Sequence, residues 1–258
     1  MIPYNTITAW GVSHPWVTRE QVEQDMLLSK AICDIYNNEK LAKELIFRGG
    51  TALNKLILNE PYRYSEDLDF VRTSAGGIGD IMKELTNLGK ATGYEVKTKI
   101  GQYPKLYWLT QAQTGLNIRI KIEINTQERT PSLPVITTRH SIKSDWCSCE
   151  SKIISYRPEE IAATKIRALY QRSKGRDLFD LWLLTTEVGV DIAMVLSAFT
   201  TYRPIGYNGK KGINNLLLKL KNTGFISDIK SMLSPRIDYY SPDNAANIII
   251  NEYLTKIS

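Results

Sequence analysis

A pair of glycines followed by a hydroxyl residue is the first pattern in the chain with clear chemical meaning. Gly49 and Gly50 follow a short apolar run, and Thr51 opens a segment with helical spacing. Glycines let backbone amides approach a phosphate closely, and the N-terminus of a helix adds a partial positive charge. Gly49, Gly50 and Thr51 are therefore candidate ligands for the phosphates of a nucleotide.

Two aspartates follow at strand spacing. Asp67 and Asp69 belong to the run Asp67-Leu68-Asp69-Phe70-Val71, and residues i and i+2 of a strand share a face. Two parallel carboxylates repel each other unless a cation lies between them, and Mg²⁺ prefers such oxygen ligands. Each motif alone is common by chance. Together, in this order, they predict a magnesium-dependent nucleotide enzyme.

A third carboxylate stands in a strictly alternating segment. Between Ile118 and Ile124 the isoleucines form one face, and Arg119, Lys121 and Glu123 form the other. A neighbouring strand could place Glu123 beside the two aspartates, as a metal ligand or as a base. An ordinary solvated face of an antiparallel strand explains the alternation equally well.

A second charged group lies in the C-terminal half. Lys165 borders an apolar helical stripe, and Asp177 and Asp180 lie in a segment that is otherwise almost wholly apolar. Carboxylates in such surroundings need partners. Arg176, four residues before Asp180, Lys165 and Arg63 are candidates, so a structural ion-pair network is one interpretation of this group.

The composition limits the class of protein. With 258 residues, 43% of them hydrophobic and 23% charged, the chain is typical of a globular protein with one or two domains. There is no apolar run of transmembrane length and no secretory signal, so we expect a cytoplasmic protein without a membrane partner. The excess of 33 Lys and Arg over 27 Asp and Glu mildly favours a polyanionic partner.

Cysteines and histidines exclude further classes. The 3 cysteines cannot form a closed disulfide framework, and a thiolate zinc site needs other spacings. Neither of the 2 histidines lies in a sequence that resembles a nucleophile elbow. A metal in this protein must therefore be held by carboxylates.

Periodicity and turn residues predict the elements that position these groups. The N-terminal half is expected to be mixed α/β, the stretch 126–157 irregular, and the remainder helical. The expected helices cover 18–37, 51–58, 80–91, 158–172, 176–187, 191–199, 210–222 and 242–256. The expected strands cover 45–47, 67–71, 94–100, 104–110 and 116–125, the last two joined by a turn at 113–115.

Two sequence blocks resemble the AbiEii/MenT-type nucleotidyltransferase toxins of the DNA polymerase β-like superfamily. The first reads RGGTALNK from Arg48 to Lys55 and RYSEDLD from Arg63 to Asp69. The second reads KIRALYQR from Lys165 to Arg172 and GRDLFDL from Gly175 to Leu181. The resemblance implies an α+β fold: a polymerase β-like nucleotidyltransferase lobe with a mixed sheet, residues 1–155, followed by an all-helical lobe, residues 156–258.

The resemblance also implies an activity. The enzyme would move an NMP from an NTP onto RNA, at the 3′ end of tRNA, and act as the toxin of a toxin–antitoxin or phage-defence system with a cognate antitoxin. Two alternatives stay open. The acceptor could be a protein hydroxyl, as in AMPylating enzymes, or the chain could be an inactive nucleotide-binding module.

The family pattern assigns roles to further residues. Lys165 would bind the triphosphate, Asp177 would belong to the active site, and Asp180 is its competitor for that role. Lys55 would help to neutralise phosphate charge. Ser65 would place its hydroxyl at the mouth of the metal site if the strand of Asp67 extends back that far; otherwise it caps the start of the strand.

Overall fold

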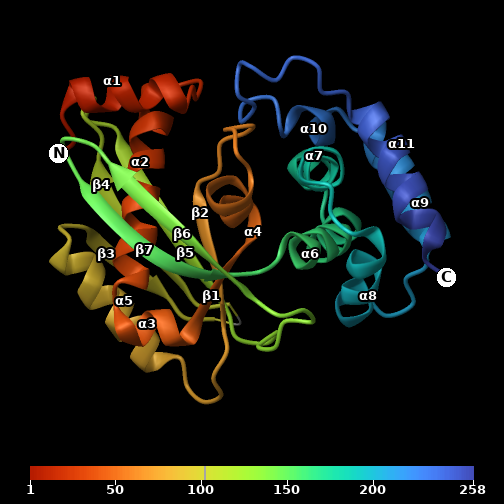
Figure 1. The fold of residues 1–258 in the computed structure, drawn as a ribbon, viewed down its shortest axis with the longest axis horizontal. Coiled ribbons are helices and arrows are strands. Elements are labelled where there is room, and N and C mark those ends of the chain that lie inside the picture. The colour runs from red at the N-terminus through yellow and green to blue at the C-terminus, as the bar shows by residue number, and fades with distance from the viewer. Residues whose placement is uncertain (102) are drawn as a thin grey trace. The chain divides into compact units, whose positions relative to one another are not determined.

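The computed structural model describes residues 1–101 and 103–258, which group into two compact units. Unit 1 comprises Met1–Pro131 and Val135–Ser155, and unit 2 comprises Ser132–Pro134 and Tyr156–Ser258. Unit 1 contains a mixed seven-stranded sheet with helices, whereas unit 2 is built from helices (Figure 1). This arrangement confirms the prediction of an α+β fold.

Most helices and strands of unit 1 lie where the sequence predicts them. Its helices are α1 (Tyr4–Ser13), α2 (Arg19–Tyr36), α3 (Glu39–Glu44), α4 (Gly49–Ala52), the π-helical turn η1 (Leu53–Ile57) and α5 (Gly79–Ala91). Its strands are β1 (Leu45–Arg48), β2 (Asp67–Arg72), β3 (Glu95–Lys99), β4 (Lys105–Gln111), β5 (Asn117–Asn125), β6 (Ile136–Lys143) and β7 (Ser148–Ser155).

The sheet has the order β3-β4-β5-β2-β1-β7-β6. Strand β2 runs parallel to β5 and antiparallel to β1, and β1 runs parallel to β7. The predicted hairpin of β4 and β5 is confirmed, with Gly115 at φ +81° in its turn. The central position of β2 brings residues from β1 and β5 to either side of its two aspartates.

Local signals explain the main helix and strand of the core. Thr18 and Gln21 form the predicted capping box at the start of α2, each side chain bonding the other's backbone amide. Helix α2 packs on β5, β6 and β7, and α5 packs on β3 and β4. The isoleucines of β5 are buried, as its alternation predicts, and its polar residues line the other face.

The prediction of an irregular stretch at 126–157 is wrong, because β6 and β7 form an antiparallel hairpin there. Strand β6 lies at the edge of the sheet, and most of its residues are polar. An edge strand buries little apolar surface, so its hydrophobic alternation is weak. Pro131 and Pro134, which suggested a loop, lie before the hairpin.

Three short helices were also not predicted, α1 and α3 in unit 1 and α10 (Thr223–Ser227) in unit 2. Helix α1 has no side-chain cap at its N-terminus, so it lacks the usual start signal. Helix α3 begins at Asn38, whose side chain accepts hydrogen bonds from the amides of Lys40 and Leu41. Asn37 is the C-cap of α2, and the next residue, Asn38, is the N-cap of α3.

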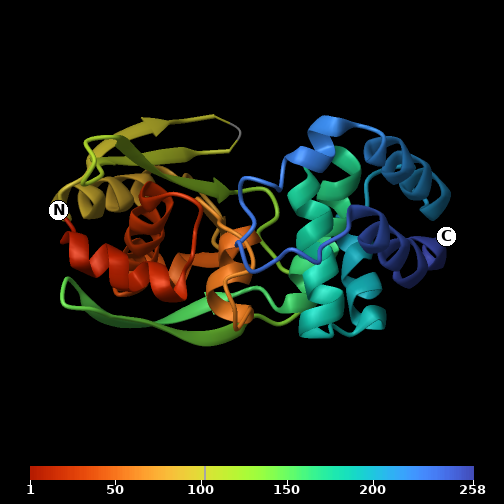
Figure 2. The ribbon, with the colours of Figure 1, turned by 90° about the horizontal axis from the view of Figure 1, so that it is seen from above.

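Unit 2 consists of helices that pack around α6 and α7 (Figure 2). They are α6 (Pro158–Gln171), α7 (Gly175–Leu183), η2 (Leu184–Val188), α8 (Ile192–Tyr202), α9 (Gly209–Leu220), α10 (Thr223–Ser227), α11 (Pro242–Glu252) and η3 (Leu254–Lys256). Pro158 occupies the first turn of α6, where its missing amide is harmless. The helices predicted for this half are confirmed, with ends shifted by a few residues.

Among the described residues, no helix combines the length and the apolar composition that crossing a membrane requires.

Candidate active site

The first candidate site is a group of three carboxylates on adjacent strands, which we call the strand cluster: Asp67, Asp69 and Glu123. In the parallel register of β2 and β5, Asp67 lies opposite Lys121 and Asp69 lies opposite Glu123. On the other side of β2, Asp69 lies opposite Arg48 of β1. The sheet topology therefore brings the three predicted carboxylates onto one face, with cations between and beside them.

Two lysines neutralise part of this negative charge. Lys121 Nζ lies 2.7 Å from Asp67 Oδ2 and 3.6 Å from Glu123 Oε2, and Lys105 Nζ lies 3.0 Å from Glu123 Oε2. Burial alone would lower the pKa of Lys121, but the neighbouring carboxylates outweigh it and raise that pKa. Sequence reasoning placed Lys121 on the face of Glu123 without giving it a role.

Asp69 has the least favourable surroundings of the three. Burial raises its pKa; Arg48 opposes this shift, and the charges of Asp67 and Glu123 add to it. An ionised Asp69 is therefore short of positive charge in the protein alone. The donor set suits a hard divalent cation. Among the described residues, however, no three His, Cys, Asp or Glu side chains are already arranged to hold a metal.

The Gly-Gly turn lies directly against the strand cluster. Gly49 has φ +81°, and a Cβ atom on it would lie 2.7 Å from Asp69 Oδ2. A Cβ atom on Gly50 would lie 2.3 Å from the guanidinium of Arg63. Gly49 thus requires glycine, because its φ is positive and Asp69 lies too close for a side chain, whereas a side chain at Gly50 would have to displace the guanidinium of Arg63.

The hydroxyl of Thr51 is used inside the protein. It is buried, donates to the carbonyl of Asp67 at 2.5 Å and bonds Ser65 Oγ at 2.8 Å. Thr51 therefore ties the Gly-Gly turn to the start of β2. Only its backbone remains for a phosphate.

Ser65 reaches the site by a different route from the one predicted. Strand β2 begins at Asp67, so the face argument does not apply to Ser65. Its hydroxyl lies behind the turn, bonded to Thr51 and 3.3 Å from where a Cβ of Gly50 would stand. Ser65 is a buried residue, with 9% of its surface exposed. It therefore supports the Gly-Gly turn from inside the protein and does not face the solvent.

Lys55 is directed to another partner. Its Nζ lies 2.7 Å from Asp25 Oδ2 on α2, and the two side chains are 5% and 0% exposed. None of the contacts described for Lys55 reaches a residue of the strand cluster. This partner lies 30 residues away in sequence, and no local pattern could have indicated it.

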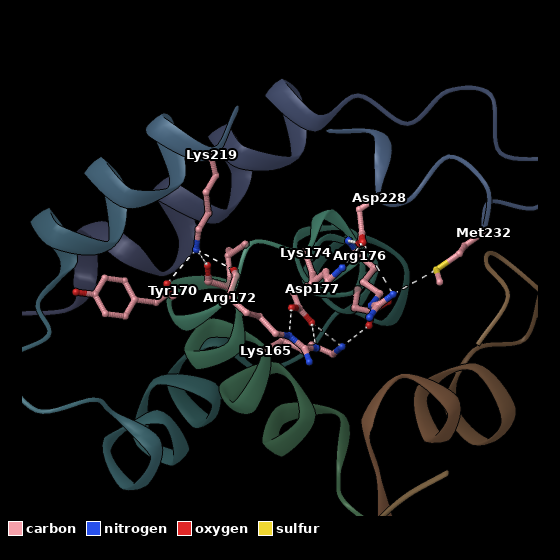
Figure 3. Close-up of polar contacts among 11 residues, drawn as sticks. Lys165, Tyr170, Arg172, Lys174, Arg176, Asp177, Lys219, Asp228 and Met232 are labelled. Atoms are coloured by element: carbon pink, nitrogen blue, oxygen red, sulfur yellow. Dashed lines mark hydrogen bonds and ion pairs between the residues drawn. The ribbon is translucent and has the colours of Figure 1, made fainter. Parts of the chain in front are cut away.

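The second candidate group lies in unit 2, and we call it the helix cluster: Lys165, Arg172, Asp177 and Asp180. Lys165 Nζ lies 3.0 Å from Asp177 Oδ1 and 2.5 Å from Asp180 Oδ2. Arg172 donates from Nε and Nη2 to both oxygens of Asp177, at 2.6 and 2.7 Å (Figure 3). Lys165 thus bonds both aspartates, as one of the predicted pairings has it, whereas Arg172 was not among the predicted partners.

The charges of the helix cluster are matched. Burial by itself raises the pKa of Asp177, but Lys165 and Arg172 outweigh it and hold that pKa well below its usual range. Arg176, a predicted partner of Asp180, instead has its guanidinium Nη1 4.0 Å from Asp228 Oδ1, and its backbone amide donates to Asp228 Oδ2 at 3.3 Å (Figure 3).

Lys219 is a half-buried cation that sequence reasoning missed. It donates to the backbone carbonyls of Leu169, Tyr170 and Arg172 at the C-terminal end of α6 (Figure 3). A cation there complements the helix dipole and satisfies carbonyls that lack helical partners. Burial lowers the pKa of Lys219 to about 8. Its role follows from packing that the sequence does not display.

Comparison with known proteins identifies the family. The model of the AbiEii nucleotidyltransferase toxins, of type IV toxin–antitoxin systems, matches residues 31–236. The chain belongs to this family, and the resemblance of its two sequence blocks is confirmed. It is accordingly a nucleotidyltransferase toxin of a type IV toxin–antitoxin system. No curated protein sequence matches the chain significantly.

Two solved structures are similar to this chain, and the first of them supports the fold. MenT4, a nucleotidyltransferase toxin from Mycobacterium tuberculosis H37Rv, superposes with a TM-score of 0.68 at 14% identity, covering 100% of this chain and 91% of MenT4. An antigenic nucleotidyltransferase-like protein from Paracoccidioides brasiliensis matches with a TM-score of 0.48 at 18% identity, over 83% of this chain and 97% of its own. The first of these shows that the chain has the fold of the MenT toxins.

Proposed function

We propose that this enzyme transfers an NMP from an NTP to an RNA acceptor, at the 3′ end of tRNA, and that Asp67 and Asp69 hold the Mg²⁺ that the reaction needs. The observation that carries the proposal is the placement of the two carboxylates. They share one strand face, Glu123 lies opposite Asp69, and the backbone of Gly49 lies close to the side chain of Asp69. The positive net charge of +6 favours RNA over a protein acceptor.

The proposed reaction is a displacement at the α-phosphorus. The acceptor hydroxyl oxygen bonds to that phosphorus, the bond to the bridging α–β oxygen breaks, and pyrophosphate leaves with the electron pair. Catalysis of such transfers is mostly positioning and charge neutralisation. A bound Mg²⁺ supplies positive charge for the phosphate oxygens and for the otherwise undercompensated Asp69.

The remaining residues of unit 1 orient the reactants. The backbone of Gly49, Gly50 and Thr51 binds the β- and γ-phosphates, and Ser65 keeps Thr51 in place through their hydrogen bond. Glu123 completes the metal site or takes the proton of the acceptor hydroxyl. With Mg²⁺ held by the carboxylates, the neighbouring ammonium groups of Lys105 and Lys121 would be available to neutralise phosphate oxygens.

For the helix cluster, family resemblance and geometry favour different roles. The resemblance assigns Lys165 to the nucleotide and Asp177 to the active site. The contacts favour a structural role, because Lys165 is 7% exposed and already bonds both Asp177 and Asp180. We therefore propose that the main role of the helix cluster is structural, and that its ion pairs hold α6 against α7.

A transfer assay tests the function. Purified protein is incubated with each α-labelled NTP, Mg²⁺, and either total RNA or total protein. We expect label in small RNA, lost on chelation of the metal and in the Asp67→Asn and Asp69→Asn variants. Label in protein alone would favour the AMPylator alternative, and no label with normal NTP binding would favour an inactive nucleotide-binding module. Co-expression with the cognate antitoxin should relieve growth inhibition.

A further inference from the structure

A buried ion pair connects helix α2 to the turn that follows the glycines. Asp25 lies in the middle of α2, and Lys55 lies in η1, directly after α4. Their charged groups are 2.7 Å apart, and their side chains are 0% and 5% exposed. Trp10 of α1 donates its indole N–H to the same oxygen of Asp25 at 2.8 Å. Three helical segments therefore meet at one carboxylate.

Such a pair is a poor way to gain stability alone. Desolvation of two charges offsets much of their attraction, and apolar residues of similar size often stabilise a core equally well. What a buried ion pair does provide is a fixed distance and direction between the two backbones that carry it. The pair between Asp25 and Lys55 is therefore better explained by the position that it gives η1 relative to α2 than by a gain in stability.

The turn that Lys55 belongs to is also unusual. A π-helical turn is rare, and such turns occur frequently at functional sites. The residue beside Lys55, Asn54, donates its side-chain amide to the carbonyl of Arg63 at 2.9 Å. The guanidinium of Arg63 in turn occupies the space beside Gly50. A continuous set of contacts thus runs from Asp25 through η1 and Arg63 to the Gly-Gly turn.

We infer that Asp25 and Lys55 are positioning residues, which hold η1 so that Gly49, Gly50 and Thr51 keep their place against Asp69. The inference rests on the proposed nucleotidyl transfer. It assigns Lys55 an indirect effect on nucleotide binding, through the backbone of the turn rather than through contact with a phosphate. Asp25, which belongs to neither sequence block, then acts together with Lys55 in holding the turn.

Three variants separate the two roles of Lys55: Asp25→Asn, Lys55→Met, and the double variant. Asparagine keeps an acceptor for Trp10, and the double variant leaves no buried charge without a partner, so it folds even where a single variant does not. For the double variant we expect a loss in kcat/KM for the NTP of about 10-fold to 100-fold, the size typical of displaced reactive groups. A rise in KM should account for most of it.

Asp25→Asn is the decisive single variant. If Lys55 only positions the turn, Asp25→Asn raises KM for the NTP as Lys55→Met does, and the double variant is no worse than the singles. If Lys55 binds phosphate directly, Asp25→Asn frees the ammonium and leaves KM unchanged or lower, and that result overturns the inference. Lys55→Arg, which keeps the charge, should recover part of the affinity.

A matched control uses an ion pair at the opposite end of β2. Arg72 and Glu44 are 2.8 Å apart, and the double variant Glu44→Gln/Arg72→Met should lower stability without changing KM for the NTP. Equal KM changes in both double variants would show a general loss of stability and refute the inference. Absence of transfer by the wild-type enzyme would instead refute the proposed function, and an NTP-binding titration of the same variants would still test the positioning role.

Discussion

The strand cluster of unit 1 and the helix cluster of unit 2 both concentrate carboxylates, and their surroundings differ. In the helix cluster, Lys165 and Arg172 meet every oxygen of Asp177, and the pKa of Asp177 is held low. In the strand cluster, burial and the neighbouring carboxylates raise the pKa of Asp69 despite the charge of Arg48.

The difference indicates which carboxylates are suited to bind a cation or substrate and which only stabilise the fold. A buried carboxylate that the protein already satisfies contributes to structure, whereas one that lacks positive charge gains from an added cation or substrate. By this criterion we propose the strand cluster as the reactive centre and the helix cluster as a structural element.

The largest effect is expected for the aspartates of β2. Asp67→Asn or Asp69→Asn should reduce transfer by about three orders of magnitude or more, as when a group that stabilises phosphoryl transfer is removed. Stability should hold, and for Asp69→Asn it should rise, because the ionised carboxylate is unfavourable in the fold. Transfer rates and urea unfolding of the same samples check this. Normal rates in an unfolding-prone variant would reverse the assignment.

The next largest effect concerns stability and the helix cluster. Lys165→Ala removes the buried ammonium that Asp177 and Asp180 share and should cost about 3–5 kcal/mol of unfolding free energy. As a control, Lys174→Ala removes a largely exposed partner of Asp228 and should cost about 0–1 kcal/mol. Urea denaturation beside an NTP titration measures both. An intact fold with lost NTP affinity would make the helix cluster a phosphate site as well.

A charge placed behind the glycine turn should affect activity more than fold. Ser65→Asp adds a carboxylate beside Thr51 and close to Asp67, so it should repel the triphosphate and lose most transfer activity. Phosphorylation of Ser65 would act in the same way with about −1.5 to −2 charges. Ser65→Ala removes one hydrogen bond, worth about 1 kcal/mol, and should keep substantial activity. Wild-type rates for Ser65→Asp would place Ser65 outside the site.

The smallest effect is a pH dependence confined to unit 1. Burial, followed by the charge of Lys55, lowers the pKa of both His14 and His140 to about 4, against the opposing charge of Asp25. An unfolded chain therefore binds more protons than the folded one below the ordinary histidine pKa. Stability should fall as the pH drops from about 6.5 to 5, by about 1.5 kcal/mol for each histidine.

The helix cluster should not respond in that range, because the pKa of Asp177 lies far below it. Urea unfolding at several pH values measures the effect, and the variant His14→Gln/His140→Gln should flatten the curve. An unchanged slope in that variant would assign the acid sensitivity to other groups.

Several features of this protein follow from the sequence alone. The capping box of Thr18 and Gln21, the buried isoleucine face of β5 and the shared face of Asp67 and Asp69 all depend on contacts within a few residues. Local periodicity determines such features, because backbone geometry repeats every 2 residues in a strand and every 3.6 in a helix. The glycine turn and the two sequence blocks sufficed to recognise the family.

Other features were decided by the tertiary structure. The parallel pairing of β2 with β5 makes Glu123 a neighbour of Asp69, and packing against α2 pairs Lys55 with Asp25 rather than with the strand cluster. The hairpin of β6 and β7 likewise forms at an edge where polar residues hide the strand pattern. In each case a charged or polar side chain had several acceptable partners far away in sequence. The choice among them depends on which surfaces the whole fold buries together, and no local pattern contains that information.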